Sequence, residues 1–289
     1  MTRAQGVDVS HWDISFEPEK ASKPIDFAIM KLSEAVYPDP KITEIWEGVK
    51  KVPIRGAYHY LRSMWGWKEQ ADKFLELATP LDFHFYCLDF EGIGNTLDRT
   101  FALLAQSWMA YVAMQTKKRV VLYTNPSHYD ADLYPYGDWM QLYPLWIAQY
   151  WKTPSPDRNP ALPKKRKKGD WHIWQWASEI NYPGHGHEYG CGGNSVDLNI
   201  YNGMVDEMRL WLRLDAAPPV NEKQYRVVVG HLNIRVAPNV NASIVGGMNQ
   251  GQIFAVAEKI KTGEFTWLKL KDGRYVCERA EYLYVEEVS

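Results

Sequence analysis

The stretch Phe85-Tyr86-Cys87-Leu88-Asp89-Phe90-Glu91-Gly92 is an apolar run that ends in two carboxylates separated by one residue. Aromatic and aliphatic residues of this kind, bounded by turn formers, favour a buried strand. Because side chains alternate along a strand, Asp89 and Glu91 lie on one face with their Cα atoms ~6.5–7 Å apart. A generic Asp-x-Glu is also typical of surface acids or of a helix N-cap, but Gly92 and Gly94 loosen the backbone where a substrate could approach. The stretch therefore predicts a strand whose end delivers two acids to one site.

Strand-like and helical patterns alternate through the first part of the chain. The longest helical pattern covers residues 97–116, where apolar residues recur near i, i+3, i+4 and i+7. After residue 125 the segments between strands lose this periodicity, which returns only at 204–214. This order predicts an α/β fold, a TIM-like (β/α) barrel whose last helices are reduced. Strands are expected at 6–10, 27–32, 52–60, 85–92, 120–125, 145–150, 172–176 and 195–201, and further helices at 38–51 and 67–77.

Several acids fall at or near the ends of these predicted strands. Barrels of this class carry their sites at the carboxyl ends of the strands, whereas random surface acids would scatter along helices. The constellation therefore predicts a carboxylate site. A content of 13 Trp and 18 Tyr exceeds what a core requires, and amphipathic rings suit the flat apolar faces of sugars. The acids are Asp8, Glu34, Asp89, Glu91 and Asp197.

Composition limits the classes of partner and compartment. With 33 Lys and Arg against 35 Asp and Glu, the net charge of −2 gives no field that favours nucleic acid. Cys87, Cys191 and Cys277 are odd in number, far apart and without metal-ligand spacing, so reduced thiols and no metal are expected. Residues 1–5 enter a strand pattern without an apolar leader, and no run of about 18 apolar residues occurs. The sequence predicts neither a signal peptide nor a membrane span, and no cofactor.

The pattern changes beyond residue 213. Residues 214–222 predict a short semi-rigid linker between the barrel at 1–213 and a second domain at 223–289. Short alternating strands separated by Gly, Asn and Pro turns predict that this second domain is a small all-β barrel. Its strands are expected at 225–229, 232–235, 243–246, 252–256, 267–270 and 274–277.

Six motifs of the first domain occur in the order of a known family. They are Gly6-Val7-Asp8-Val9-Ser10-His11-Trp12, Gly56-Ala57-Tyr58-His59-Tyr60, Leu88-Asp89-Phe90-Glu91, Leu122-Tyr123-Thr124, Ile173-Trp174-Gln175-Trp176 and Val196-Asp197-Leu198-Asn199. Over about residues 5–213 the chain resembles the glycoside hydrolase family 25 lysozymes, the N-acetylmuramidases of bacteria, their phages and some fungi. The resemblance implies hydrolysis of the β-1,4 bond between N-acetylmuramic acid and N-acetylglucosamine in peptidoglycan. Trp176 departs from the motif, which often has Tyr there.

The second domain carries a resemblance of its own. Leu232-Asn233-Ile234-Arg235, Pro238, Gly251 and Trp267-Leu268-Lys269-Leu270 look like the bacterial SH3 (SH3b) cell-wall-binding module. This resemblance implies an SH3-like barrel whose aromatic-lined groove engages the peptide part of the wall. Core filling is the competing interpretation for Trp267 and Tyr275.

The local chemistry assigns roles to the acids of the barrel. Glu91 is expected to be the general acid, because repulsion from neighbouring carboxylates would raise its pKa and keep it protonated near neutral pH. Asp89 would attack or stabilise the oxocarbenium-like centre, or orient the substrate's own N-acetyl group as nucleophile. The i, i+2 spacing allows both the ~5–5.5 Å retaining and the ~6.5–9.5 Å inverting separations. The family resemblance implies net retention with substrate assistance. The predicted catalytic set is Glu91, Asp89, Asp8 and Asp197.

Aromatic, amide and acidic side chains near strand ends are expected to bind the substrate. Rings at such positions stack on sugar faces, and amides hydrogen bond to N-acetyl groups. Packing in the core is the alternative for about half of them. The predicted set is Glu34, Tyr58, Tyr60, Tyr123, Gln175, Trp176 and Asn199.

Two loops of the barrel carry unusual composition. The run Lys164-Lys165-Arg166-Lys167-Lys168 predicts a solvated loop rather than a targeting or nucleic-acid patch, with attraction to anionic wall polymers as an intermediate possibility. His185, His187 and Cys191 lack the second pair of ligands that a zinc site would need.

The whole sequence predicts a two-domain muramidase, expected to be a monomer, whose partner is bacterial peptidoglycan: glycan at the barrel and wall peptide at the second domain. Without a signal peptide, a phage or prophage endolysin is expected, which accumulates in the cytoplasm of the producing cell and acts on the wall after release. A secreted enzyme whose leader had been removed would have the same sequence features. The four motif acids disfavour an inactive wall-binding barrel, and the second domain disfavours a chitin hydrolase.

Overall fold

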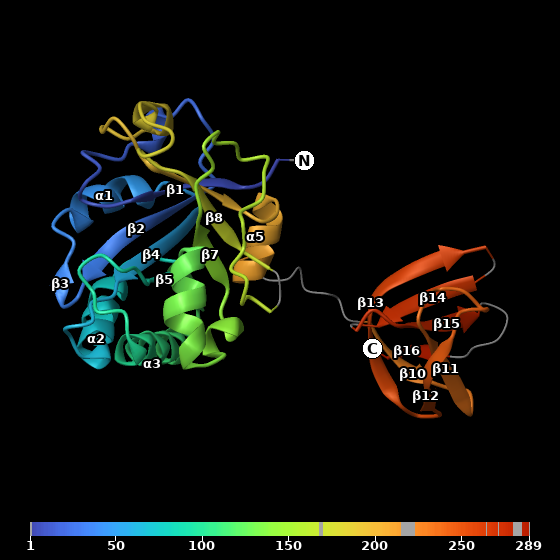
Figure 1. The fold of residues 1–289 in the computed structure, drawn as a ribbon. Helices are drawn as coiled ribbons and strands as arrows, with labels where there is room; N and C mark the ends of the chain where they lie inside the picture. The colour runs from blue at the N-terminus through green and yellow to red at the C-terminus, as the bar shows by residue number, and fades with distance from the viewer. Residues whose placement is uncertain are drawn as a thin grey trace. The chain divides into compact units, whose positions relative to one another are not determined.

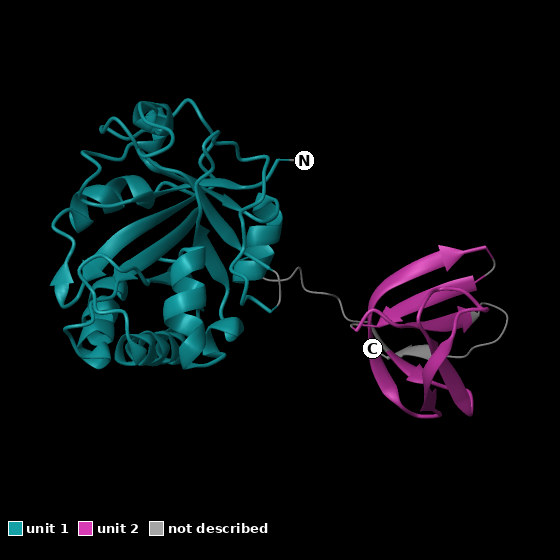
Figure 2. Cartoon of the chain, in the orientation of Figure 1, with its two compact units in different colours: residues 1–214 teal, residues 215–289 magenta. Residues whose placement is uncertain are grey.

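The computed structural model describes residues 2–167, 170–214, 223–263, 265–270, 272–279 and 285–288. The chain divides into two compact units, residues 1–214 and 215–289 (Figure 2). This division lies one residue from the predicted end of the first domain. Apart from Leu214, the predicted linker lies outside the described residues.

Unit 1 is built on a closed barrel of eight strands (Figure 1). The order around the barrel is β1-β9-β8-β7-β6-β5-β4-β2, and pairing of β2 with β1 closes it, while the short β3 extends β2 at its edge. The predicted strands are all present, with bounds that differ by a few residues. They are β1 (Gln5–Val9), β2 (Phe27–Glu34), β3 (Tyr37–Pro38), β4 (Ile54–Tyr60), β5 (Phe85–Asp89), β6 (Arg119–Thr124), β7 (Leu145–Ala148), β8 (Ile173–Ala177) and β9 (Asp197–Tyr201).

The direction of β9 departs from the predicted TIM-like pattern. β9 pairs antiparallel with both of its neighbours, β1 and β8, whereas the other neighbouring barrel strands run parallel. A parallel neighbour needs a crossover, usually a helix, that returns the chain to the other end of the sheet. Residues 178–196, between β8 and β9, hold only a short 3₁₀ turn at Gly186–Tyr189. The chain therefore re-enters the barrel from the end at which it left, and the barrel is mixed.

Helices pack outside the first part of the barrel: α1 (Ile42–Val49), α2 (Trp67–Ala78) and α3 (Arg99–Thr116), with α5 (Val205–Leu212) after β9. The N-terminus of α3 is capped by Asp98, whose side chain accepts a hydrogen bond from the backbone N–H of Phe101. Between β6 and β7 the chain forms only short turns, as predicted: α4 (Pro126–His128), a π turn (Tyr129–Leu133) and 3₁₀ turns (Tyr134–Tyr136 and Trp139–Leu142).

Residues on both faces of the barrel strands are buried, which explains why the strands are continuous apolar runs. Along β5, Phe85 and Cys87 belong to one hydrophobic cluster, and Tyr86 and Leu88 to the cluster that includes the helices. Two glycines make room for the first cluster. A Cβ on Gly6 would lie 2.5 Å from the ring of Phe27, and a Cβ on Gly56 would lie 2.5 Å from the ring of Phe85. These glycines are required by close packing of aromatic rings.

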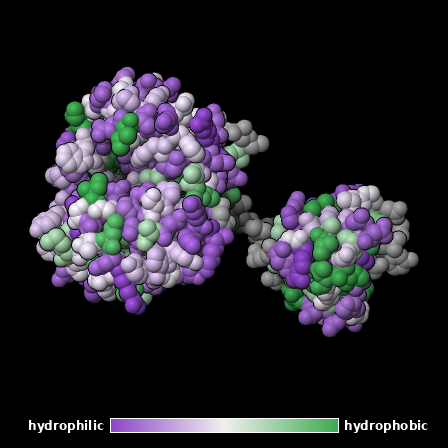
Figure 3. Space-filling model, viewed as in Figure 1, coloured by the Kyte–Doolittle hydropathy of each residue, from purple (hydrophilic) through white to green (hydrophobic). Residues whose placement is uncertain are grey.

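Unit 2 is an all-antiparallel sheet of order β12-β11-β15-β14-β13-β10-β16. Trp267 is only 1% exposed, which favours the core interpretation for its ring, whereas Tyr275 is partly exposed. Figure 3 shows an apolar area on the visible face of this unit. The assignment to the SH3-like class stays a prediction. The strands are β10 (Lys223–Val227), β11 (His231–Arg235), β12 (Ile244–Asn249), β13 (Ile253–Thr262), β14 (Phe265–Leu270), β15 (Tyr275–Arg279) and β16 (Val285–Val288).

Candidate active site

A cleft of about 600 Å³ opens at the carboxyl ends of the parallel strands. Asp8 of β1 and Asp197 of β9 are paired residues in the strand register, so the antiparallel course of β9 places the first residue of that strand beside the end of β1. Glu91, two residues beyond β5, also lines the cleft. Three predicted acids therefore face one cavity. The other lining residues include the rings of Trp12, Tyr58, Tyr123 and Tyr150.

Two buried amides hold the carboxylates of Asp8 and Asp197 in place. The Gln175 Nε2 donates to Asp8 Oδ2 over 2.8 Å and to Asp197 Oδ2 over 3.1 Å. The Asn199 Nδ2 donates to the same oxygen of Asp8 over 2.7 Å. Gln175 and Asn199 are 2% and 1% exposed. Predicted to bind substrate, these amides instead lie behind the carboxylates and orient them.

A second layer of hydrogen bonds fixes the orientation of each amide. The carbonyl oxygen of Gln175 accepts from the hydroxyl groups of Tyr123 at 2.8 Å and Tyr150 at 2.5 Å. The carbonyl oxygen of Asn199 accepts from the indole N–H of Trp146 at 2.8 Å. Because each oxygen is already an acceptor, the NH₂ groups must face the acids. The network sets the direction of the donors as well as their positions.

Burial makes the paired acids weak. It raises the pKa of Asp8 to about 7, although the hydrogen bonds from Asn199 and Gln175 act in the opposite direction. Burial also raises the pKa of Asp197, and repulsion from Asp8 adds to the rise. The two carboxyl groups therefore retain protons at pH values where free aspartic acids are ionised.

Asp89 and Glu91 differ in their surroundings although they are neighbours in sequence. Asp89 is 7% exposed and its Oδ1 has no hydrogen-bond partner, whereas Glu91 is partly exposed to the cleft. Burial raises the pKa of Asp89, and repulsion from Glu91 raises it further. Burial is also what raises the pKa of Glu91, while the nearby Tyr123, His128 and Lys31 act in the opposite direction. Repulsion between carboxylates, the predicted cause of a raised pKa at Glu91, therefore acts at Asp89, whereas the pKa of Glu91 is raised by burial.

A family model described as "Glycosyl hydrolases family 25" matches residues 7–185, more than half of the chain. The chain belongs to glycosyl hydrolases family 25. It is a glycoside hydrolase of the lysozyme type. Asp197 and Asn199 lie beyond the matched region, and the antiparallel β9 brings them to the site.

The chain is also similar in sequence to a curated relative and in fold to solved structures. "Uncharacterized protein YegX" of Escherichia coli K12 is 26% identical over 216 residues, 72% of each chain. A bacterial lysozyme from Streptomyces coelicolor has a similar fold, with a TM-score of 0.60 and 23% identity over 74% of this chain and all of its own. The catalytic domain of endolysin ply40, from bacteriophage P40 of Listeria monocytogenes, also has a similar fold. Its TM-score is 0.57, with 18% identity over 74% of this chain and 98% of its own.

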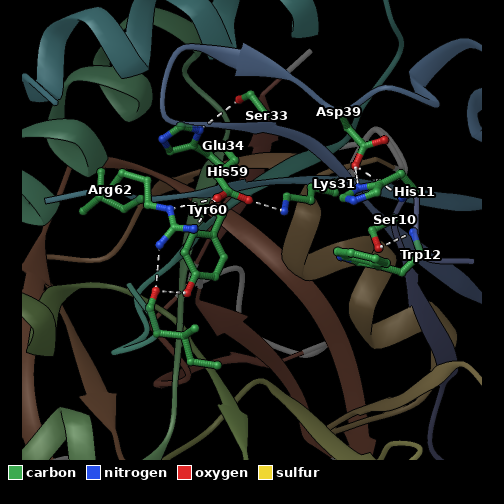
Figure 4. Close-up of polar contacts among 12 residues, drawn as sticks. Ser10, His11, Trp12, Lys31, Ser33, Glu34, Asp39, His59, Tyr60 and Arg62 are labelled. Atoms are coloured by element: carbon green, nitrogen blue, oxygen red, sulfur yellow. Dashed lines mark hydrogen bonds and ion pairs between the residues drawn. The ribbon is translucent and has the colours of Figure 1, made fainter. Parts of the chain in front are cut away.

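A second cleft of about 520 Å³ on this family 25 barrel is lined by Glu34, whose polar contacts Figure 4 shows. Its carboxylate bridges two cations, accepting from Lys31 Nζ at 2.6 Å and from Arg62 Nη2 at 2.5 Å. Both cations also lie over the ring of Tyr60, at 5.3 and 4.8 Å from its centroid. The hydroxyl of Tyr60 and Nη1 of Arg62 donate to the carbonyl of Ile93. Predicted as binding residues, Glu34 and Tyr60 thus belong to a preformed ionic cluster.

The structure brings together some predicted binding residues and separates others. Tyr58 and Tyr123 line the main cleft, but Trp176 is 6% exposed, absent from both cleft linings, and packs 5.9 Å from the ring of Tyr182. Sequence reasoning missed Trp12, whose 81% exposed side chain stands at the rim, and Asp13, whose pKa burial raises to about 6. Trp12 is the last residue of the motif that contains Asp8, and Asp13 directly follows it, so their position was the available signal.

The basic loop differs from expectation at one residue. Arg166 is 5% exposed, and its guanidinium donates to the carbonyl groups of Met140 and Tyr143 and to Asp170. The predicted solvated loop is therefore wrong for Arg166, which ties the loop to the barrel. His185 is also buried, stacked on a tyrosine ring. In the described part of the chain, no group of three His, Cys, Asp or Glu residues is arranged to hold a metal ion, and no helix is long and apolar enough to span a bilayer.

Proposed function

We propose that this family 25 hydrolase is a muramidase that cleaves the β-1,4 bond between N-acetylmuramic acid and N-acetylglucosamine in bacterial peptidoglycan. The observation that carries the proposal is the cleft in which Glu91, with a pKa raised by burial, faces Asp8 and Asp197 below a rim of aromatic rings. A carboxyl that keeps its proton is a general acid, and rings at the rim suit the apolar faces of sugar units. The lysozyme and endolysin names of the similar structures support it.

In the proposed mechanism Glu91 protonates the leaving glycosidic oxygen. Positive charge then develops at the anomeric carbon, and the buried carboxylates around the cleft stabilise it most strongly when they are ionised. Asp89 lies deeper than Glu91 and has an unsatisfied oxygen, so it is suited to accept the N–H of a substrate N-acetyl group. This favours substrate assistance, in which the N-acetyl oxygen attacks the anomeric carbon as the glycosidic bond breaks. Water, whose proton Glu91 accepts, then opens the cyclic intermediate, and the two inversions together retain the configuration.

The second unit is proposed to hold the barrel at the wall. Its sequence resembles an SH3b module, and a cleft of about 470 Å³ on it is lined by His231, Phe265 and Trp267, among other residues. The proposed partner is the peptide part of peptidoglycan. With such a module the chain acts as a phage or prophage endolysin, made in the cytoplasm and active on the wall after release.

Digestion of purified peptidoglycan tests the reaction. Mass spectrometry should find new reducing ends on N-acetylmuramic acid, and Glu91→Gln should release none. New reducing ends on N-acetylglucosamine, or cleavage of peptide bonds alone, would overturn the muramidase assignment. A parallel digest of chitin oligomers should show little release, which separates muramidase from chitinase action. Proton NMR of the product formed first should show the β-anomer; an initial α-anomer would exclude retention.

A further inference from the structure

A third cleft of unit 1 lies at the opposite end of the barrel from the acids and has a volume of about 540 Å³. It is formed where β5 and β6 begin and where α3 and α5 end, so the catalytic carboxylates at the other strand ends take no part in it. Its lining residues are Asp82, Phe83, His84, Lys117, Lys118, Arg119, Val120, Tyr143, Pro144, Leu212, Arg213 and Leu214.

Four cations in this lining form no ion pair with a carboxylate in the part of the chain that the structure describes. Among the described residues, no Asp or Glu oxygen lies within 4.0 Å of the charged groups of Lys117, Lys118, Arg119 or Arg213. The single acid of the lining, Asp82, is already paired with Arg55 at 2.6 Å. The cleft therefore concentrates positive charge in a chain whose net charge is −2.

Two of the cations are held in place by backbone carbonyl groups. The ammonium of Lys118 donates to the carbonyl of Phe83, and Nε of Arg119 donates to that of Trp211 at 2.5 Å. Arg119 also lies over the ring of Trp211, 5.1 Å from its centroid. Burial lowers the pKa of Arg119, and the neighbouring Arg213 lowers it further. The positions of these charges are fixed despite their mutual repulsion.

The other two cations occupy backbone positions that suit glycine. Lys117 ends α3 with φ of 58° and Arg213 ends α5 with φ of 59°, both in the left-handed region. Helix ends of this type usually carry Gly, which has no Cβ to strain. Apart from Ala35, they are the non-glycine residues with positive φ in the described part of the chain.

Helix dipoles explain only part of this charge. Each helix C-terminus carries about −0.5 elementary charge, so the two ends offset about one of the four positive charges. About three positive charges remain to attract a ligand. Arg and Lys side chains are the usual partners of phosphate, which they bind through charge-assisted hydrogen bonds.

We propose that this cleft binds a phosphodiester polymer, a chain that places several phosphate groups along the recess. Four cations contributed by two helix ends and a strand start match several linked phosphates better than one small anion. A recess also admits a polymer chain more readily than it admits a flat bilayer. Such binding would anchor the barrel by its far end and leave the acid-lined cleft open, and it is measured independently of any hydrolysis.

Isothermal titration calorimetry of the full chain with soluble poly(glycerol phosphate) tests the proposal. Binding should weaken with salt, as expected when cations neutralise phosphates. The double variant Lys117→Gly/Arg213→Gly should bind about tenfold or more weakly, with a log–log salt slope less steep by about 1 to 2. Because Gly suits both backbone positions, the thermal unfolding midpoint of this double variant should equal or exceed that of the wild type.

Matched variants separate this site from general charge. Lys20→Gln/Lys50→Gln removes two exposed cations elsewhere and should bind like the wild type, as should Lys117→Arg/Arg213→Lys, which keeps the charges. Equal loss in the Lys20/Lys50 variant, or undiminished binding by the glycine variant, would overturn the proposal. Binding to vesicles containing phosphatidylglycerol but not to the polymer would also overturn it, because the occupant would be a lipid headgroup.

Discussion

Replacing Asp8 with Asn should stabilise the barrel at neutral pH while it damages the site. Burial raises the pKa of Asp8 from 3.8 to about 7, a difference of about 3 units. One unit corresponds to about 1.4 kcal/mol, so keeping the ionised side chain buried costs about 4 kcal/mol above pH 7. The folded state binds the proton more tightly than the unfolded state. The free energy of unfolding of the wild type therefore falls as pH rises from about 4 to about 7. Below about pH 4 the side chain is protonated in both states, so the cost of burying its charge is absent.

The variant is suited to the test because Asn fits the same hydrogen bonds. Its carbonyl oxygen can accept from Gln175 and Asn199, as Oδ2 of Asp8 does, and its NH₂ group would face the neighbouring acids. Urea unfolding at pH 4, 5.5 and 8 measures the effect. Tryptophan fluorescence reports unit 1, since 12 of the 13 Trp residues lie within residues 1–214. The gain in unfolding free energy should be near zero at pH 4 and reach about 4 kcal/mol at pH 8.

The control is Asp157→Asn, an exposed carboxylate whose replacement should change stability by less than about 0.5 kcal/mol at every pH. Hydrolysis of peptidoglycan by Asp8→Asn should fall although the protein is more stable. A loss of stability at pH 8, or a gain that is the same at pH 4 and pH 8, would refute the reasoning that burial of this charge is costly.

Four further outcomes are expected. Glu91→Gln should lose about 10²-fold or more of its activity on peptidoglycan. If the enzyme accepts an activated aryl glycoside, Glu91→Gln should regain its rate of bond cleavage on that substrate, whereas Asp89→Asn should regain less. The opposite pattern in leaving-group assays would reverse the two roles. Gln175→Met removes the acceptor of two tyrosine hydroxyls and a donor to the carboxylates of Asp8 and Asp197, and it should cost about 1–3 kcal/mol in urea unfolding; an unchanged midpoint would contradict this. Truncation after Leu214 should leave a folded barrel that cleaves soluble glycan fragments but works poorly on whole walls; equal activity on walls would argue against a binding module. Thiol titration of the denatured, non-reduced chain should count three free thiols, and fewer would show a disulfide.

The barrel could be predicted from sequence because its strands are buried on both faces. Each strand is then a continuous apolar run, and the helices show a clear 3.6-residue period. The loss of helices after β6 was visible in the same way. The ends of strands were less predictable, since β2 continues through Ser33 to Glu34, two residues beyond its predicted end. Ser33 is hydrogen bonded to His59 and Glu34 forms an ion pair with Lys31, and a hydropathy pattern does not record such pairing.

The roles of the amides illustrate what the sequence could not contain. Gln175 and Asn199 stand in recognisable motifs near strand ends, so a part in the site was predictable. Whether an amide contacts substrate or orients a carboxylate depends on which groups lie behind it. The partners of Gln175 are 22 to 167 residues away along the chain, and only the closed barrel brings them together.

Asp197 shows how one topological feature completes the site. In a uniform parallel barrel, the first residue of a strand would lie at the end away from the site, and Asp197 begins β9. The loop after β8 lacks a crossover helix, so β9 runs antiparallel and its first residue pairs with Asp8. Repulsion between these two acids adds to the burial that weakens Asp197 as an acid. The reduced helices of the last part of the barrel are therefore linked to its chemistry: inserting a full crossover helix would reverse β9 and remove Asp197 from the cleft.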